Sequence, residues 1–285
     1  MSPPRVIVGI DGSMASFGAL DAAATEARLR TAELEVITCV DDPDEAGPVL
    51  RAAAARVARR HPGLSVTTAP VVGDPADVLA ERGGRAALTV VGSRDLSGIA
   101  GLLLHSVSRR LAARTVTPLL VVRGTPLPSR RPSAGGVLLG LESDGDADAA
   151  LFAFEEAELR RARLDVLHAW TYRQAPPDHR DDRPEPVLDS IERQARDRAA
   201  LTGGLLMPLR QTSPHLAVNS RTIRSTPCRA LIEATAKADM VVIGTHPRPG
   251  RSGTELGTVT LALLRHAHCP VAIVPVLAAG IPLRG

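Results

Sequence analysis

Aromatic residues, lysine and cysteine are all scarce in this chain of 285 residues, and each shortage excludes a class of protein. Aromatic side chains make up 2% of the chain and Lys237 is its only lysine, so the basic and aromatic surface typical of nucleic-acid binding is not predicted. The three cysteines, Cys39, Cys228 and Cys269, are odd in number and far apart. They favour reduced thiols in a cytoplasmic protein over a disulfide framework.

Long apolar runs are also missing. The N-terminal stretch has no charged segment followed by a long apolar core, and no later run approaches the roughly 18 residues of a membrane span. The composition of 44% hydrophobic and 23% charged residues is that of an ordinary globular protein. We therefore expect a soluble, cytoplasmic protein with neither a membrane nor a nucleic acid as partner.

A tandem repeat organises what is present. The interval between Gly92 and Gly244 recurs between Ser106 and Thr258. Each copy has an apolar run that ends in glycine, a Gly-rich segment, and a Ser/Thr pair that opens a helix, which are features suited to holding phosphate. A chain of this length fits about two domains. We place the first domain at 1–124, a linker at 125–136, the second domain at 137–278 and a tail at 279–285.

Both copies alternate short β-branched runs with Ala-rich helical segments, which predicts parallel sheets covered by helices. The expected strands are 5–11, 34–40, 64–72, 87–91 and 119–122, then 137–141, 164–170, 216–223, 240–243 and 271–274. The expected helices are 15–30, 49–60, 75–82 and 106–113, then 147–161, 187–200, 227–236 and 258–266. The polar segment 172–186 is expected to be a loop.

Glycines inside the first strands carry a separate expectation. Gly9 and Gly140 stand where helices pack on a sheet, so an added side chain would overpack the core. We expect them to matter more for stability than the glycines of the Gly-rich loops. Gly92 and Gly244 have two interpretations, a role in phosphate binding and a role as simple turn glycines.

Several common site motifs are excluded. The first strand leads into Gly-Ile-Asp-Gly-Ser and not into Gly-x-Gly-x-x-Gly, and Lys237 follows no P-loop. A classical dehydrogenase or a P-loop motor is therefore not predicted. His266, His268 and Cys269 lack partner ligands at metal-site spacing, so a helix end is favoured over a metal site.

Several segments nevertheless match one known family. The first copy contains VIVGIDGS at 6–13, GDPADVL at 73–79 and VVGSR at 90–94, and the second contains VVIGTH at 241–246 and HAHCPVAIV at 266–274. The chain resembles a tandem member of the universal stress protein family. The resemblance implies two tandem doubly wound, Rossmann-like domains, each with a five-stranded parallel sheet of order 3-2-1-4-5 and helices on both faces. It further implies ATP binding and pairing of the two domains through their fifth strands, and it leaves a homodimer open.

The resemblance also implies a site. In this strand order the crevice between the first and fourth strands is where ligands bind. Asp11 would contact the nucleoside, Cys39 and Val40 would line the adenine, and Ser106 and Ser108 would hold phosphate at a helix N-terminus. The implied nucleotide-binding residues are Ile10, Asp11, Cys39, Val40, Gly92, Ser93, Arg94, His105, Ser106, Val107 and Ser108 in the first copy, and Leu141, Glu142, Ala169, Gly244, Thr245, His246, Gly257, Thr258, Val259 and Thr260 in the second.

Both copies depart from the family pattern. Asp95 and His105 occupy two glycine positions in the first copy, and a carboxylate at 95 would repel phosphate. In the second copy Pro247 cannot donate an N–H, and Glu142 replaces the aspartate that ends the first strand. We expect the copies to differ in affinity, and Asp95→Gly to tighten ATP binding more than Pro247→Gly.

Three functions remain on sequence grounds. The first is a non-catalytic, cytoplasmic stress-response protein that binds ATP or another adenine nucleotide, with the bound state altering contacts with an unidentified protein partner. The second is a nucleotide-free protein-interaction module that has lost its ATP site, which the substitutions at 95, 105 and 247 favour. The third is a slow ATPase, for which the sequence shows neither a positioned base nor a cluster of Mg²⁺ ligands.

Overall fold

The computed structural model describes residues 3–93, 106–123, 135–172, 187–245, 248–250 and 253–276. The first repeat consists of β1 (Arg5–Gly9), α1 (Met14–Leu29), β2 (Glu33–Val40), η1 (Pro43–Ala46), α2 (Gly47–Arg60), β3 (Val66–Val72), α3 (Pro75–Gly83), β4 (Leu88–Ser93), α4 (Val107–Ala112) and β5 (Leu119–Arg123). The second consists of β6 (Val137–Leu141), η3 (Asp144–Asp146), α5 (Ala147–Arg160), β7 (Leu164–Trp170), α6 (Val187–Thr212), β8 (Val218–Arg224), α7 (Pro227–Thr235), β9 (Met240–Thr245), β10 (Arg248–Gly250), β11 (Gly253–Glu255), α8 (Thr258–His266) and β12 (Val271–Pro275).

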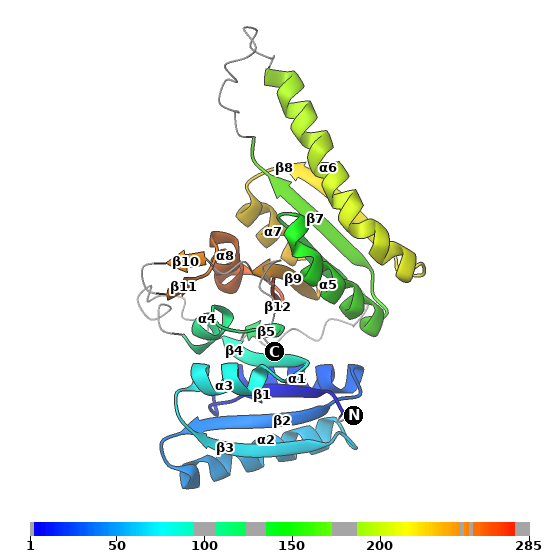
Figure 1. Cartoon of the computed structure of the whole chain (residues 1–285). Helices are drawn as coiled ribbons and strands as arrows, with labels where there is room; N and C mark the ends of the chain where they lie inside the picture. The colour runs from blue at the N-terminus through cyan, green and yellow to red at the C-terminus, as the bar shows by residue number, and fades with distance from the viewer. Residues whose placement is uncertain are drawn as a thin grey trace, which may run out of the picture.

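The strands form one long sheet of ten strands, in which the two expected five-stranded sheets join edge to edge. Its order is β3-β2-β1-β4-β5-β12-β9-β6-β7-β8, and Figure 1 shows the two repeats stacked along it. Counted within each repeat, this is the order 3-2-1-4-5 that the resemblance implied. The pairs inside each repeat are parallel.

The two repeats join through their fifth strands, as predicted. β5 and β12 pair antiparallel, with Val271 opposite Val121 and Ile273 opposite Leu119. All four of these side chains are buried. An apolar strand of this kind is an aggregation hazard when it forms a free sheet edge. Pairing the two fifth strands removes both edges from solvent.

Helices cover both faces of the sheet, which makes each repeat doubly wound. One face packs against α1, α2, α5 and α6, through residues such as Leu20 and Leu206. The other packs against α3, α4, α7 and α8, through residues such as Leu79 and Leu263. Each apolar layer contains residues of both repeats. No described helix combines the length and the apolar composition that crossing a membrane requires.

The helix expected at 187–200 was drawn too short. α6 continues to Thr212, through Gly203, Gly204 and Pro208. These residues weaken an isolated helix, but Leu206 on the same stretch is fully buried against the core. Tertiary packing therefore overrides local propensity here. The short antiparallel pair β10–β11 was not expected either, since the sequence there is Gly-rich.

The strand glycines stand where close packing was expected. A Cβ on Gly9 would lie 2.6 Å from a methyl group of Leu79 in α3, and one on Gly140 would lie 2.9 Å from a methyl group of Leu231 in α7. These helices can approach the sheet only because no side chain intervenes. The comparison with the Gly-rich loop at 94–105, which is outside the described residues, stays a prediction.

Four charged side chains are buried where the repeats meet. Glu26 and Arg30 pair within α1, and Glu156 and Arg160 pair within α5. Each arginine also pairs with the glutamate of the other helix. The side chain of Glu156 is 0% exposed. Burial raises the pKa of Glu26, and this effect is larger than the lowering caused by the positive charge of Arg30. The four groups balance in charge, so the cluster stabilises the interface only while it is complete.

Removing one member of this cluster should be costly. We expect Glu156→Ala to lower the free energy of unfolding by about 3 to 5 kcal/mol, because it leaves two largely buried guanidinium groups to share the one carboxylate of Glu26. Glu155 on the same helix is exposed, so Glu155→Ala should change stability by no more than about 0.5 kcal/mol. Chemical denaturation of both variants measures the difference. Similar losses in the two variants would contradict this account of the interface.

Candidate functional site

A cavity of about 390 Å³ opens at the carboxyl ends of the second repeat's strands. It lies where β6 and β9 are neighbours and the chain winds away from them in opposite directions, the usual ligand position in such sheets. The volume is in the range of small-molecule sites. Its lining consists of Gly140, Leu141, Glu142, Asp146, Ala169, Thr171, Thr226, Pro227, Cys228, Leu231, Ile243, Gly244, Gly257, Thr258, Val259 and Thr260.

Two helix N-termini converge on this cavity. α7 starts after Thr226 and α8 starts after Gly257, and neither helix has a side-chain cap or an acidic residue in its first turn. Their first N–H groups are therefore not satisfied by cap side chains. Each N-terminus carries about half a positive charge from the helix dipole. Together they make this end of the cavity attractive to an anion.

Carboxylates stand at the β6 end of the cavity. Asp146 is 2% exposed, and its Oδ2 accepts hydrogen bonds from the backbone N–H groups of Glu142 at 2.7 Å and Ser143 at 3.0 Å. This bonding fixes the turn that follows β6.

The positive potential of the cavity does not come from side chains. Burial lowers the pKa of His168, which pairs with Leu141 in the sheet register, so its imidazole is neutral at pH 7. The described lining contains no Lys, Arg or His, which leaves the helix N-termini as its source of positive potential.

The first repeat satisfies the equivalent N–H groups internally. Asp74 caps α3, since its carboxylate accepts from Ala76 at 3.0 Å and from Asp77 at 3.2 Å. A hydrogen bond from Arg110 holds the pKa of Asp74 below its usual value. Ser106 caps α4, accepting from the N–H of Arg109 at 3.4 Å. Asp74 and Thr226 occupy equivalent positions in the repeat, so the two crevices differ at the residue that starts this helix.

Most residues implied for the second repeat do line its cavity. They are Leu141, Glu142, Ala169, Gly244, Gly257, Thr258, Val259 and Thr260. Thr245 is buried but lies outside the lining. His246, with Pro247, falls outside the described residues.

In the first repeat the implied residues fall in two groups. Asp11 Oδ1 accepts a hydrogen bond from the N–H of Ser13 at 3.0 Å, which forms a local turn just before α1. Ile10 follows β1, Cys39 and Val40 end β2, and Val107 begins α4. Ser93, Ser106 and Ser108 share a void of about 20 Å³ with side chains of α8, which is room for one water molecule. Arg94, Asp95 and His105 are outside the described residues.

Gly92 and Gly244 are strand residues, so their interpretation as turn glycines is wrong. A Cβ on Gly92 would lie 2.7 Å from the carbonyl oxygen of Ala15. A Cβ on Gly244 would collide with the carboxylate of Asp146. Gly92 is therefore required for the start of α1 to lie against β4. Gly244 is likewise required for η3 to lie against β9. This requirement holds whether or not a phosphate binds nearby.

Sequence reasoning missed four polar residues of the second-repeat cavity, Asp146, Thr171, Thr226 and Cys228. Thr226 and Cys228 begin α7, and Asp146 closes η3. The signal for Thr226 was available, because it stands where the first repeat has Asp74 of its Gly-Asp-Pro motif. The described residues contain no group of three or more His, Cys, Asp and Glu that would hold a metal ion.

Comparison with known proteins agrees with this architecture. The sequence model of the universal stress protein family matches residues 4–123 and 136–275. The chain belongs to the universal stress protein family. A universal stress protein of Mycobacterium tuberculosis is 28% identical over 299 residues, covering 96% of this chain and 99% of its own.

Solved structures of the family also match this chain. A universal stress protein from Archaeoglobus fulgidus superposes with a TM-score of 0.63 at 14% identity, covering 95% of this chain and 98% of its own, which shows the shared fold. A universal stress protein crystallised with cAMP is 36% identical, with a TM-score of 0.39, and covers 44% of this chain and 100% of its own.

Substitutions can separate the packing glycine from the cavity glycine. We expect Gly92→Ala to lower the free energy of unfolding by about 1 to 3 kcal/mol, because the new methyl group meets backbone that cannot move aside. Gly257 has nothing within 4 Å of an added Cβ and has φ −63°. Gly257→Ala should therefore cause no steric clash and cost less than about 1 kcal/mol, through the poorer N-cap of α8. Thermal and urea denaturation test this, and a larger loss in Gly257→Ala would show that the assignment is wrong.

Proposed function

We propose that this protein binds ATP or another adenine nucleotide in the cavity of the second repeat and acts without catalysis. The nucleotide-bound state would then alter contacts with a protein partner during a stress response. The site residues of this proposal are those that line the second-repeat cavity, including the residues that the family resemblance implied there.

One observation carries the proposal, the convergence of two uncapped helix N-termini on one cavity. Phosphate oxygens would accept from the free N–H groups at the start of α8, with the hydroxyls of Thr258 and Thr260 beside them. Gly257 leaves that approach open, since an added Cβ there would meet no other atom. Backbone donors that are already in position cost little to order when the ligand binds.

The other end of the cavity suits a nucleoside. Leu141, Ala169 and Ile243 supply apolar surface for a base. Glu142 and Asp146 accept hydrogen bonds and repel phosphate, so we place ribose hydroxyls on their side and phosphates at α8. This orientation separates the ligand's negative charge from the protein's carboxylates.

The capped helices of the first repeat fit the alternative function, a protein-interaction module that binds no nucleotide. Its α3 is capped by Asp74, which Arg110 neutralises, and its α4 is capped by Ser106. We assign to it a structural and partner-binding role, and nucleotide binding to the second repeat.

Exchanging the two cap residues tests this assignment. Thr226→Asp gives the second repeat the cap of the first, which satisfies the N–H groups of α7 and adds a negative charge to the cavity. We expect ATP affinity, measured by calorimetric titration, to fall about tenfold or more. Asp74→Thr is the matched control in the first repeat and should leave affinity unchanged. An effect of Asp74→Thr alone would move the site to the first repeat, and no ATP or AMP binding by the unaltered chain would refute the proposal.

Native cysteines provide an independent measurement. Cys228 lines the second-repeat cavity, Cys39 ends β2 in the first repeat, and burial raises the pKa of Cys39 and raises that of Cys269 to about 12. At an ATP concentration about ten times Kd, alkylation of Cys228 should slow about tenfold, because only the empty site reacts. The rate at Cys39 should not change, and Cys269 should stay unreactive at pH 8. Protection of Cys39 in place of Cys228 would contradict the assignment.

A further inference from the structure

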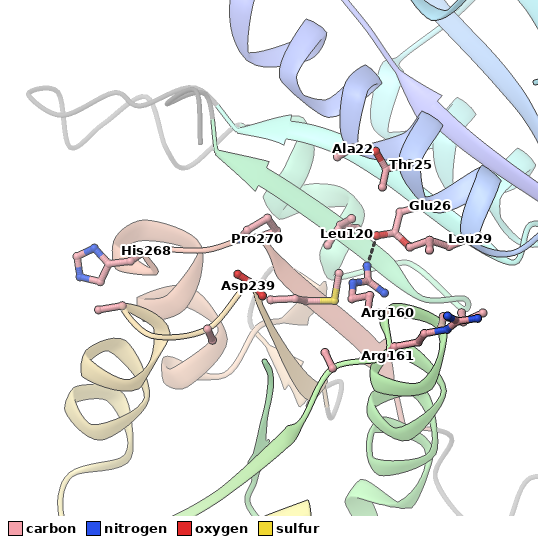
Figure 2. Close-up of a pocket in the computed structure, with 15 residues that line it drawn as sticks. Ala22, Thr25, Glu26, Leu29, Leu120, Arg160, Arg161, Asp239, His268 and Pro270 are labelled. Atoms are coloured by element: carbon pink, nitrogen blue, oxygen red, sulfur yellow. Dashed lines mark hydrogen bonds and ion pairs between the residues drawn. The ribbon is translucent and has the colours of Figure 1, made fainter. Parts of the chain in front are cut away.

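A further cavity lies between the two repeats, away from the second-repeat cavity. Its volume is about 640 Å³. Figure 2 shows its walls, which come from α1 and β5 of the first repeat, the end of α5, and the segments that lead into β9 and β12. Most of the wall is apolar, with Leu29, Leu120, Leu159 and Met240 among its side chains. A cavity of this size accommodates a small organic molecule.

The internal repeat relates the cavity to an equivalent place on the other side of the interface. The interval that separates Glu26 from Glu156 also separates Ala22, in the cavity wall, from Phe152. Phe152 is buried, and the guanidinium of Arg30 lies 5.9 Å from the centre of its ring. On the cavity side Arg160 and Ala22 both belong to the wall, and the cation–ring contacts within the described residues are those of Arg30 and Arg56. The place that an aromatic ring fills in one half is thus left open in the other.

The same comparison reveals a polar group that only the cavity has. Asp239 lies in the wall, at the position where the first repeat has Ala87. Its carboxylate makes no hydrogen bond or ion pair with the part of the chain that the structure describes, and Figure 2 shows it in the centre of the site. His268, which replaces Val116 of the first repeat, is exposed and lies at the far edge of the site.

The charges around the cavity decide which ligand it suits. Arg160 pairs with both Glu26 and Glu156, and Arg30 completes the cluster, so these four groups cancel. Arg161 also belongs to the wall, but it is exposed and lies at the α5 end, on the other side of the site from Asp239 (Figure 2). Asp239 is then the unpaired charge in the centre of the described wall. A half-buried carboxylate beside apolar surface is best satisfied by a cationic hydrogen-bond donor.

We propose that this inter-repeat cavity binds a small apolar molecule that carries a cationic amine, with the amine paired to Asp239. The apolar body lies against Leu29, Leu120 and Met240, in the place equivalent to the Phe152 ring. The ligand bridges the two repeats, because the walls of the cavity belong to both. This site is independent of nucleotide binding in the second-repeat crevice.

Three probes of one shape distinguish charge from apolar binding. Phenylbutylamine, phenylbutanol and phenylbutyrate are titrated against the full chain and followed by ligand-observed NMR. We expect the amine to bind about tenfold more tightly than the alcohol, since it adds a charged hydrogen bond, and the carboxylate to bind most weakly. Saturating ATP should not displace the amine.

Matched variants place the probe in the cavity. Asp239→Ala introduces the first repeat's residue and should weaken amine binding about tenfold while leaving the alcohol unchanged. Ala22→Phe introduces the second repeat's residue and should abolish binding of all three probes. Glu233→Ala removes an exposed carboxylate that pairs with Arg229 outside the cavity, and should have no effect. If Ala22→Phe fails to fold, Asp239→Ala decides alone.

Several results would overturn the proposal. They are equal affinities for amine and carboxylate, no measurable binding of the amine, unchanged amine binding in Asp239→Ala, and displacement of the amine by ATP. The last result would put the amine in the nucleotide crevice. The first three results do not depend on whether ATP itself binds, so the two proposals fail separately.

Discussion

The antiparallel pairing of β5 with β12 is the constraint on which the rest of the structure depends. Both strands are apolar along nearly their whole length, and neither repeat could expose such an edge without risking aggregation. Once they pair, α1 and α5 are brought face to face. The buried Glu26, Arg30, Glu156 and Arg160 can then satisfy one another across the interface. An ion-pair cluster of this kind adds specificity to the alignment that the strands impose.

Duplication followed by divergence explains the two cavities. Equivalent positions began with the same environment, so a difference between repeats points to a difference in what each position must do. Thr226 in place of Asp74 leaves a helix N-terminus open, and Phe152 in place of Ala22 closes one side of the interface. The two repeats thus share one backbone design and differ in which helix ends and which hollows they leave accessible.

Much of the fold could be predicted from the sequence, because apolar runs and Gly or Pro boundaries fix element type locally. The long α6 could not, since its continuation past Gly203 and Pro208 depends on packing of Leu206 against the sheet. The site was predictable at the residues that match family motifs. What those residues do at the helix ends was not, because Thr226 is a residue type favoured as a cap yet makes no cap bond. The inter-repeat cavity depends on contacts between segments far apart in sequence.

The position of α8 gives a physical route from ligand to partner surface. Its first turn lines the second-repeat cavity, while Leu261, Leu264 and Arg265 reach the void that contains Ser106 and Ser108 of the first repeat. A phosphate held at the start of α8 therefore acts on a helix whose other side contacts the neighbouring repeat. A rigid element shared by two packed units passes a small displacement on to both, because close-packed interfaces do not deform freely. Under the proposed function, nucleotide at one end of α8 would in this way be coupled to the alignment of the two repeats through a single helix.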